Sequence, residues 1–313
     1  MKVLVTGGAG FIGSHVADAL LAAGHQVVVV DNLHTGKRQN LPAEAKFYQV
    51  DIRDRAGLEE VFLNERPDAI AHQAALANVR ESMSDPATYA EVNVIGTLHL
   101  LELARAHKVK KIVFASTGGA VYGEGYSETE QKLPFTEQSW PQPKDNYGAN
   151  KLSCEYHLDL YHANYGLQYV ALRYPNVYGP RQDSKGEAGV VAIFAGAMLN
   201  NEPTMITGDG KQQRDFTYVG DIARANLLAL EKDVVGIYNV GTGVPTDINT
   251  IHRVLAEITG YTQAPRYAPR PAGEVLATYL DSSKAKRDLG WAPTVSLEEG
   301  LRRTVEWARS TAG

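Results

Sequence analysis

Residues Val5–Gly24 read VTGGAGFIGSHVADALLAAG, and this stretch decides the fold. It joins an apolar strand-like run, Val3–Thr6, to an apolar helix-like run, Phe11–Ala23. The junction carries three glycines in the pattern G-x-x-G-x-x-G, namely Gly7, Gly10 and Gly13. Glycine has no Cβ to block a pyrophosphate, and the N-terminus of the following helix offers free N–H groups and a positive dipole. The stretch therefore predicts a dinucleotide-binding loop.

A carboxylate follows the second apolar run of the chain. Val27–Val30 is four valines, and Asp31 comes directly after them. A carboxylate about 20 positions after such a glycine loop accepts hydrogen bonds from ribose hydroxyls and repels a 2′-phosphate. The sequence therefore favours NAD over NADP. The alternative, that Asp31 only caps a loop, leaves the combination of strand, loop, helix and second strand unexplained.

Apolar runs alternate with helix-like stretches through the first half of the chain. We expect strands at Val3–Thr6, Val27–Val30, Lys46–Val50, Asp68–His72, Lys111–Ala115 and Tyr169–Arg173. We expect helices at Phe11–Ala23, Gly57–Asn64, Ala87–Ala106 and Leu152–Tyr165. This alternation predicts an α/β fold with a Rossmann-type, doubly wound parallel sheet.

The character of the sequence changes after Arg173. Prolines and glycines interrupt RYPNVYGPRQ, as expected of loops that line a cleft. We expect an NAD-binding domain over residues 1–173, with a returning segment near 215–245 in which GIYNVGTG forms a strand of the first sheet. A smaller, discontinuous α/β substrate domain is expected over residues 174–313. Beyond Arg173 we expect helices at Gly189–Asn200, Val219–Leu230 and Leu297–Ser310.

Composition excludes several classes of function. The chain has 313 residues and a formal net charge of −5, which argues against a general nucleic-acid or anionic-membrane surface. Its single cysteine, Cys154, excludes an intrachain disulfide and a multi-cysteine metal site, so no metal is predicted. We find no apolar segment of membrane-spanning length and no leader before the first strand. A cytoplasmic protein is expected.

The stretch DNYGANK places Tyr147 and Lys151 four positions apart where a helix begins. Residues at this spacing share one helix face. A neighbouring ammonium and a positive nicotinamide ring would favour the phenolate, which makes Tyr147 a proton acceptor for an alcohol that loses hydride. Lys151 would also bind the nicotinamide ribose. A solvated helix face is the alternative. Ser116 and Thr117 offer the hydroxyl that such a site needs.

Taken together, these motifs resemble the extended short-chain dehydrogenases/reductases and, among them, the UDP-glucose (UDP-galactose) 4-epimerases. The resemblance covers nearly the whole chain and rests on GGAGFIG, DIRD, HQAA, NVIGT, STGGAVYG, YGANK, RYPNVYGPRQ and GDGKQQRDFTYVGD. It implies that NAD is held by Gly7, Gly10, Phe11, Ile12, Gly13, Asp31, Asn32, Asp51, Ile52, Ala74, Asn93, Tyr147 and Lys151. Asp51 and Ile52 would bracket the adenine ring. His72 is expected to be a packed strand-end histidine.

The sequence departs from the family pattern at Gly118. Many epimerases carry there the serine that contacts the sugar O4, so Thr117, or failing that Ser116, must supply the hydroxyl. The related 4,6-dehydratases carry an acidic pair directly after the Ser-Thr, where this chain has Gly118 and Gly119. Loss of water from the sugar is therefore not expected.

The resemblance also implies a UDP-sugar site in the second half of the chain. Asn176 would reach the diphosphate or the sugar, and Arg214 and Arg270 would bind the diphosphate, with Arg266 as the alternative to Arg270. The predicted activity is epimerisation of a UDP-hexose at C4 through a transient 4-keto sugar. Alternatives are an epimerase of UDP-N-acetylhexosamine, for which Thr278 would leave room, an epimerase of UDP-glucuronate, or a non-catalytic NAD sensor. Family members pair through two helices, so a homodimer is expected.

Overall fold

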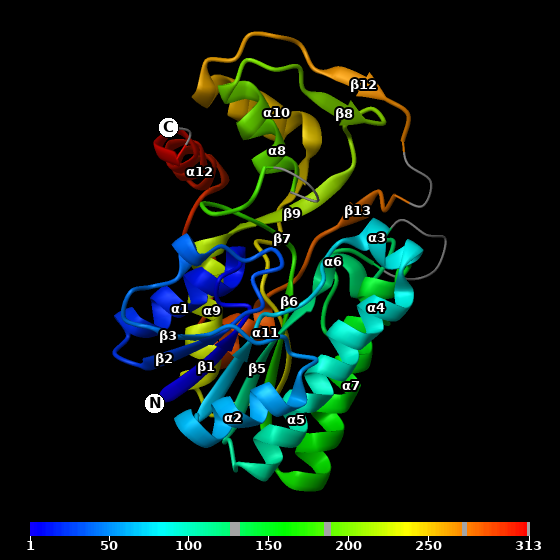
Figure 1. The fold of residues 1–313 in the computed structure, drawn as a ribbon. Helices are drawn as coiled ribbons and strands as arrows, with labels where there is room; N and C mark the ends of the chain where they lie inside the picture. Colours follow the sequence, from blue (N-terminus) through cyan, green and yellow to red (C-terminus); the bar gives the residue numbers. More distant parts are fainter. Residues whose placement is uncertain (126–131, 185–188, 271–273, 312–313) are drawn as a thin grey trace.

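A seven-stranded parallel sheet forms the centre of the molecule (Figure 1). The computed structural model describes residues 1–125, 132–184, 189–270 and 274–311. The strand order is β10-β6-β5-β4-β1-β2-β3. The strands are β1 (Lys2–Thr6), β2 (Gln26–Val30), β3 (Lys46–Tyr48), β4 (Ala69–His72), β5 (Lys111–Thr117), β6 (Gln168–Tyr174) and β10 (Gly236–Asn239). The predicted doubly wound parallel sheet is confirmed.

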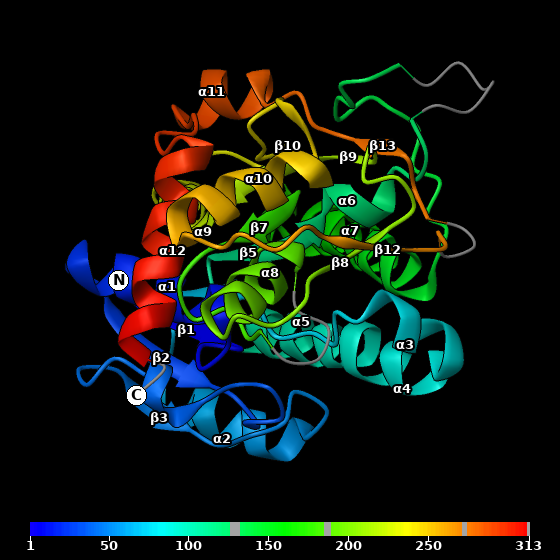
Figure 2. The same cartoon turned by 90° about the horizontal axis from the view of Figure 1, so that it is seen from above.

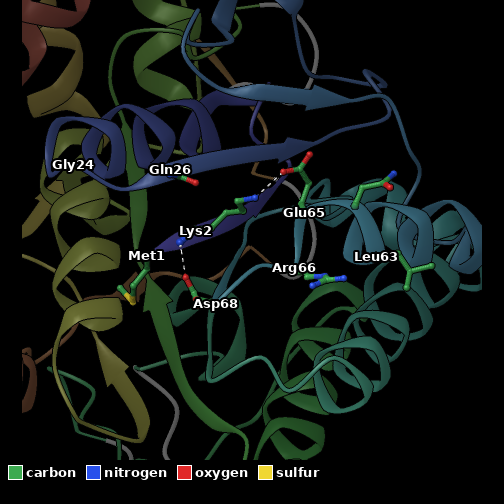
Figure 3. A pocket seen from close by; sticks show the side chains of 9 residues that line it. Met1, Lys2, Gly24, Gln26, Leu63, Glu65, Arg66 and Asp68 are labelled. Carbon is green, nitrogen blue, oxygen red and sulfur yellow. Dashed lines mark hydrogen bonds and ion pairs between the residues drawn. The ribbon is translucent and has the colours of Figure 1, made fainter.

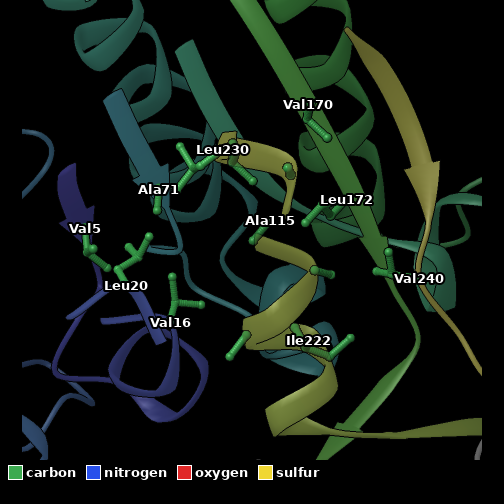
Figure 4. Packing of buried hydrophobic residues seen from close by; sticks show 14 of the residues in the cluster. Val5, Val16, Leu20, Ala71, Ala115, Val170, Leu172, Ile222, Leu230 and Val240 are labelled. Carbon is green, nitrogen blue, oxygen red and sulfur yellow. The ribbon is translucent and has the colours of Figure 1, made fainter. Parts of the chain in front are cut away.

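Helices cover both faces of this sheet, and the side-chain alternation of β1 shows why. Val3 and Val5 pack against α1 (Phe11–Ala22) and α9 (Val219–Glu231), whereas Leu4 packs on the opposite face. That opposite face is covered by α2 (Arg55–Glu65), α5 (Gly96–Ala106) and α7 (Asn146–Tyr165). Successive strand residues point to opposite faces, so a strand between two helical layers must be apolar throughout. Figure 4 shows the first of these two cores.

The long helix predicted at Ala87–Ala106 consists of three consecutive segments. These are α4 (Pro86–Ala90), a π-helical turn (Glu91–Ile95) and α5. Helix α7 begins at Asn146, six residues before the predicted start, because Asp145 caps it. The Asp145 carboxylate accepts a hydrogen bond of 2.7 Å from Gly148 N–H. Tyr147 and Lys151 therefore both lie on this helix.

The chain returns to the first sheet after a long excursion. Strand β10 pairs in parallel with β6, as predicted for GIYNVGTG, and α9 packs against α1. Helix α11 (Ser283–Leu289) adds apolar residues to the same core. The outer strand and one covering helix of the sheet thus come from residues beyond 173. The assignment of residues 174–313 to substrate binding remains a prediction.

A smaller lobe, uppermost in Figure 1, contains the other strands of the second half. Its strands are β7 (Asn176–Tyr178), β8 (Met205–Thr207), β9 (Gln213–Tyr218), β11 (Pro245–Asp247), β12 (Arg266–Ala268) and β13 (Ala277–Thr278). Its helices are α8 (Val190–Leu199), α10 (Ile248–Thr259) and α12 (Leu297–Thr311), which share one apolar core. Seen from above, these helices lie beside the sheet's carboxyl ends (Figure 2). The short strands, α10 and α11, and also α3 (Val79–Ser84) and α6 (Gly118–Val121), were not predicted.

The strand order places a topological switch point between β1 and β4. From β1 the chain builds outward through β2 and β3, and from β4 it builds the other way through β5 and β6. Ligands of open α/β sheets bind at the carboxyl ends of the strands at such a point. Among the described residues, no helix is long and apolar enough to span a bilayer.

Candidate active site

The glycine loop lies at the switch point and is shaped by close backbone approaches. A Cβ on Gly13 would lie 2.1 Å from Gly7 O, so only glycine lets α1 begin so close to the loop. Gly7 has a φ of +69°, and a Cβ there would lie 2.7 Å from Ala74 N. The segment after β4 therefore packs directly against the loop. This arrangement leaves the N-terminus of α1 open toward a ligand.

A cavity of about 390 Å³ opens at this loop. Ten of the predicted cofactor residues line it: Gly7, Gly10, Phe11, Ile12, Gly13, Asp31, Asn32, Asp51, Ile52 and Ala74. Asn93, Tyr147 and Lys151 are not part of its lining. The cavity is thus formed by the segments that follow β1, β2, β3 and β4, as expected for a dinucleotide at a switch point.

Asp31 is 7% exposed and is oriented by backbone groups. One carboxylate oxygen accepts from Ala9 N–H at 3.0 Å, and the other accepts from Leu33 N–H at 2.7 Å. An ionised carboxylate offers about four lone-pair sites, so each oxygen can still accept from a ribose hydroxyl. Neither contact neutralises the charge that would repel a 2′-phosphate.

Asp51 is more heavily engaged than the sequence suggests. Its carboxylate accepts from the Arg53 guanidinium at 3.0 and 2.8 Å and from the Asn32 amide at 2.9 Å. These bonds, those from Arg53 first, hold the pKa of Asp51 well below its ordinary value. Asp51 is therefore a carboxylate that stays ionised, and an adenine amino group would share it with Arg53.

Asn93 is hydrogen-bonded to the backbone of Leu76, in the segment that follows β4. Its amide oxygen accepts from Leu76 N–H and its amide nitrogen donates to Leu76 O, both at 2.9 Å. The residue is 2% exposed and lies in the π-helical turn. Asn93 thus holds the segment beside Ala74, and its amide keeps a second N–H and a second lone pair for another partner. Its contact with the cofactor stays a prediction.

Tyr147, Thr117 and Lys151 meet where β5 ends against α7. The Thr117 hydroxyl lies close to the Tyr147 phenol and favours its ionised form. Lys151 Nζ donates to Ala115 O at 2.7 Å and lies 5.9 Å from the centre of the Tyr147 ring. Thr117 also caps α6, because its Oγ1 accepts from Ala120 N–H at 3.2 Å. Strand β5 and helix α7 thus bring a phenol, a hydroxyl and an ammonium together.

Burial governs the acidity of this group. It raises the pKa of the Tyr147 phenol above its ordinary value; Asp145 adds to the rise, and the Thr117 hydroxyl opposes it. Burial lowers the pKa of Lys151 to about 8. In the protein alone, loss of solvent thus outweighs the groups that favour the phenolate. The expectation that Lys151 and a nicotinamide ring together favour the phenolate stays a prediction.

Ser116 is engaged elsewhere, which separates the two candidate hydroxyls. Its Oγ donates to Glu155 Oε1 at 2.5 Å, and Glu155 also accepts from Arg173 at 2.9 and 2.6 Å. Of the two hydroxyls, only that of Thr117 interacts with Tyr147. The geometry therefore favours Thr117 over Ser116 as the hydroxyl that reaches a sugar.

The two glycines after Thr117 have different surroundings. A Cβ on Gly118 would lie 2.5 Å from Leu280 Cδ1, so a serine at this position would collide with a buried leucine. A Cβ on Gly119 would lie 3.8 Å from Thr117 Oγ1 and 4.0 Å from Asn176 Oδ1. Gly119 therefore leaves open space between the predicted catalytic hydroxyl and Asn176. Thr278 is buried behind Gly118 and donates to its carbonyl at 3.5 Å.

Arg214 and Arg270 are brought together by a carboxylate that sequence reasoning missed. Glu274 lies 3.8 Å from Arg270 Nε and acts electrostatically on Arg214. Burial lowers the pKa of Arg214, and its Nη1 donates to the Gln213 carbonyl at 2.9 Å. Arg266 is an exposed residue of β12. Of the two alternatives, Arg270 is thus the one placed near Arg214.

His72 is a core residue, as predicted. It is 1% exposed, and its ring nitrogens contact Thr6 Oγ1 at 2.7 Å and Thr97 Oγ1 at 2.9 Å. Burial lowers its pKa to about 3, so the ring is neutral. A polar network that the sequence did not indicate lies nearby, in which Tyr174 links Gln73 and Asn226. Gln73 belongs to the cavity lining.

A second cavity, of about 790 Å³, lies at the amino ends of β1 and β2 (Figure 3). Lys2 and Glu65 line it, and they form an ion pair of 3.0 Å. Lys46 Nζ and the Tyr48 hydroxyl also bond Glu65, at 3.0 and 2.6 Å. None of the predicted site residues lies there.

Comparison with known proteins places the chain in a family. A model of the NAD dependent epimerase/dehydratase family matches residues 3–241. The UDP-glucose 4-epimerase of Mycolicibacterium smegmatis is 41% identical over 99% of both chains. A Thermotoga maritima UDP-glucose 4-epimerase, solved with UDP-glucose, superposes with a TM-score of 0.97 at 50% identity over all of both chains. The Thermus thermophilus enzyme, solved with NAD, gives 0.93 at 47% over the same coverage. With the glycine cradle, Asp31 and the Tyr147–Lys151 pair in place, the chain belongs to the NAD dependent epimerase/dehydratase family.

Proposed function

We propose that the protein interconverts UDP-galactose and UDP-glucose by inverting C4 of the hexose with bound NAD. The observation that carries this proposal is the meeting of Tyr147, Lys151 and Thr117 at the carboxyl end of the sheet. The enzymes that this chain matches over its whole length carry the same activity in their names. No dehydratase acid stands after Thr117, where the chain has Gly118 and Gly119.

The residues of the cavity at the glycine loop fit a dinucleotide. The loop of Gly7, Gly10 and Gly13 would take the pyrophosphate, because its backbone leaves no room for a Cβ at Gly13 and opens onto the N-terminus of α1. Asp31 would bind the adenosine ribose, and Asp51 with Ile52 would border the adenine. Bound NAD supplies a hydride acceptor for C4 of the sugar and returns the hydride afterwards.

The chain's own residues move the proton. Tyr147 as phenolate takes the proton of the sugar O4 hydroxyl, and Thr117 hydrogen-bonds the same oxygen as it becomes a carbonyl. Burial works against this phenolate, so the positive nicotinamide ring must supply most of the compensating charge. Lys151 has one N–H on Ala115 O, which leaves others for the nicotinamide ribose.

Inversion requires the hexose to turn while the diphosphate stays bound. Arg214 and Arg270 would hold the diphosphate through charge-assisted bonds; Glu274 acts electrostatically on Arg214 and lies 3.8 Å from Arg270. Gly119 has no side chain to crowd a sugar beside Thr117 and Asn176. Binding energy from the remote UDP thus positions a reacting group that is itself loosely held.

We also propose a cytoplasmic homodimer. Ile95, at the end of the π-helical turn, is 45% exposed; Tyr156 and Leu160, on the neighbouring helix α7, are 61% and 54% exposed. Apolar side chains gathered on two packed helices favour burial against a second copy. Sedimentation of the purified chain tests this, and a monomer at micromolar concentration would contradict it.

The proposed activity is tested without added cofactor. The purified chain is mixed with UDP-galactose, and UDP-glucose is sought by chromatography. Parallel samples contain UDP-N-acetylgalactosamine and UDP-glucuronate, which separates the proposed substrate from the two alternative epimerases. Formation of UDP-glucose is expected. A protein that retains NAD but interconverts none of the three would instead be a sensor.

A further inference from the structure

Beneath the Tyr147–Lys151 pair, helix α7 carries one more buried group, Glu155. It lies one helical turn beyond Lys151, so Tyr147, Lys151 and Glu155 follow one another along the same face. Glu155 is 2% exposed, although carboxylates are rarely buried without a partner. The proposed proton transfer does not use it.

The partners of Glu155 come from both strands that pack against α7. Ser116 on β5 donates to one carboxylate oxygen at 2.5 Å. Arg173 on β6 donates to both oxygens, at 2.9 and 2.6 Å, and is itself 2% exposed. Ser116 and Arg173 are direct partners in the β5–β6 ladder. Glu155 is therefore fixed at the level of the sheet where Thr117, the next residue of β5, meets Tyr147.

Two side-chain hydrogen bonds thus join α7 to β5. Lys151 binds the Ala115 carbonyl at 2.7 Å, and Glu155 binds Ser116, one residue further along β5. Two hydrogen bonds from residues one helical turn apart prevent the helix from sliding or rotating against the strand. Thr117 follows Ser116 on β5, and Tyr147 lies one helical turn before Lys151 on α7, so the two bonds fix the register in which Thr117 and Tyr147 meet.

Arg173 has no substitute for Glu155. Its guanidinium stacks 4.7 Å from the centre of the Tyr122 ring, and Nη1 has no hydrogen-bond acceptor among the described residues. Loss of the Glu155 charge would leave a buried guanidinium unpaired close to the Lys151 ammonium. Both consequences, the missing anion and the unpaired cation, disfavour a positive charge on Lys151.

We propose that Glu155 is a positioning residue of the active site: clamped by Ser116 and Arg173, it fixes α7 on β5 and keeps the Lys151 ammonium charged. The proposal deepens the epimerase function above and rests on it for its kinetic readout. Burial lowers the pKa of Lys151 to about 8, and Cys154 and the carboxylate of Glu155 oppose a larger fall.

The other groups around Lys151 cannot take over this role. The titratable groups that interact with Lys151 are Tyr147, Cys154 and Glu155 on α7 and His72 on β4, and Arg173 on β6 pairs with Glu155. His72 is neutral, and burial raises the pKa of the Cys154 thiol. Among the described residues, Glu155 is the anion that acts on Lys151.

The test compares two buried carboxylates of the same chain. Glu155→Gln removes the proposed positioning charge, and Glu65→Gln removes an equally buried carboxylate at the far end of the sheet. Each full-length, NAD-loaded variant is labelled with ¹⁵N-lysine and titrated, with Lys151→Arg identifying the Lys151 signal. We expect the Lys151 midpoint to fall by about one pH unit in Glu155→Gln and to stay unchanged in Glu65→Gln. Equal midpoints in the two variants would overturn the proposal.

Turnover provides the second readout. Lys151 must carry its proton to bind ribose, so activity is lost as pH rises through its pKa, and a lower pKa moves the alkaline limb of kcat to lower pH. We expect this displacement in Glu155→Gln alone, and its partial reversal in Glu155→Asp, which restores the charge. A wild-type chain that fails to turn over UDP-galactose would reject the proposed function, while the lysine titration would still decide the role of Glu155.

Ser116→Ala is the variant to use if Glu155→Gln does not fold, because it removes one of the two hydrogen bonds between α7 and β5 and changes no charge. Losing a single hydrogen bond to the clamp should lower kcat about fivefold with KM unchanged. A kcat within about twofold of wild type would overturn the proposal. So would a loss of more than about a hundredfold, because the Ser116 hydroxyl would then be acting on the sugar itself.

Discussion

The central sheet has a cavity at each end of its strands, and the two ends balance buried charge in different ways. At the amino end, Glu65 is surrounded by two lysines and a phenol that all donate to it, of which Lys2 is drawn in Figure 3. At the carboxyl end, Asp31 receives only two backbone N–H groups and keeps lone pairs toward the cavity. Burial is similar in both places, at 3% and 7% exposed.

The difference shows how to separate a structural charge from a functional one. A carboxylate whose bonds are all made within the protein stabilises the fold and has little left to offer a ligand. One that is oriented by backbone but not neutralised is prepared for a partner that arrives later. The hydroxyl pair follows the same rule, since Ser116 is bonded inward to Glu155 and Thr117 meets Tyr147.

The largest expected effect breaks the carboxyl end at its proton acceptor. Tyr147→Phe should lower kcat about a thousandfold, because the ring stays in place while the oxygen that takes the O4 proton is lost. NAD content and melting temperature should match wild type. Tyr156→Phe, on the exposed side of the same helix, is the matched control and should keep full activity. Unchanged turnover in Tyr147→Phe would refute the mechanism.

A second substitution compares carboxylates at the two ends. Asp31→Ala should weaken NAD binding about a hundredfold, because ribose hydroxyls lose a charged acceptor and Ala9 and Leu33 lose theirs. Asp68→Ala, at the amino end, removes a carboxylate that accepts from Lys2 N–H and should leave NAD affinity unchanged. Fluorescence titration with NADH measures both. Equal losses would mean that Asp31 acts only on folding.

At the carboxyl end, the adjacent residues Gly118 and Gly119 differ in the space around them. Gly118→Ser should lower the melting temperature by roughly 5 °C, because its Cβ would overlap the Leu280 side chain. Gly119→Ser has room and should melt close to wild type. The melting temperatures of the two variants are measured by circular dichroism during heating. A stable Gly118→Ser enzyme would show that Leu280 yields easily.

The smallest effect belongs to the amino end and depends on pH. The Tyr48 hydroxyl, followed by Lys46 and Lys2, lowers the pKa of Glu65 to about 2. A lowered carboxyl pKa contributes stability that is complete above the unfolded value and is lost as pH falls through the folded one. Glu65→Gln should therefore melt about 3 °C lower at neutral pH, and the gap should close toward pH 2. Turnover should not change.

Much of the fold was predictable because its signals are local. The valine-rich strands and the glycine loop specify the parallel sheet and its switch point within short stretches of chain. The strands of the smaller lobe are two to six residues long and show no periodicity of their own, so sequence alone did not reveal them. The early start of α7 was missed because its first turn is polar, although Asp145 three residues before Gly148 is a capping signal.

The candidate site was predictable where one motif holds it. Tyr147 and Lys151 belong to a single helix, and the cavity residues belong to the ends of consecutive strands. The group formed by Ser116, Glu155 and Arg173 spans three elements, and no spacing in the sequence announces it. Asn93 was assigned to the cofactor from the resemblance. Its hydrogen bonds to the backbone of Leu76 are visible only in three dimensions.

The return of β10 to the edge of the sheet has a consequence for anyone who wishes to divide this enzyme. A gene fragment that stops at codon 173 would encode β6 without its neighbour and the apolar side of α1 without α9. Such a product would expose the unpaired edge of β6 and the apolar side of α1, and both favour aggregation over folding. A minimal nucleotide-binding module would have to be spliced, joining the first 173 residues to the segment that ends with β10.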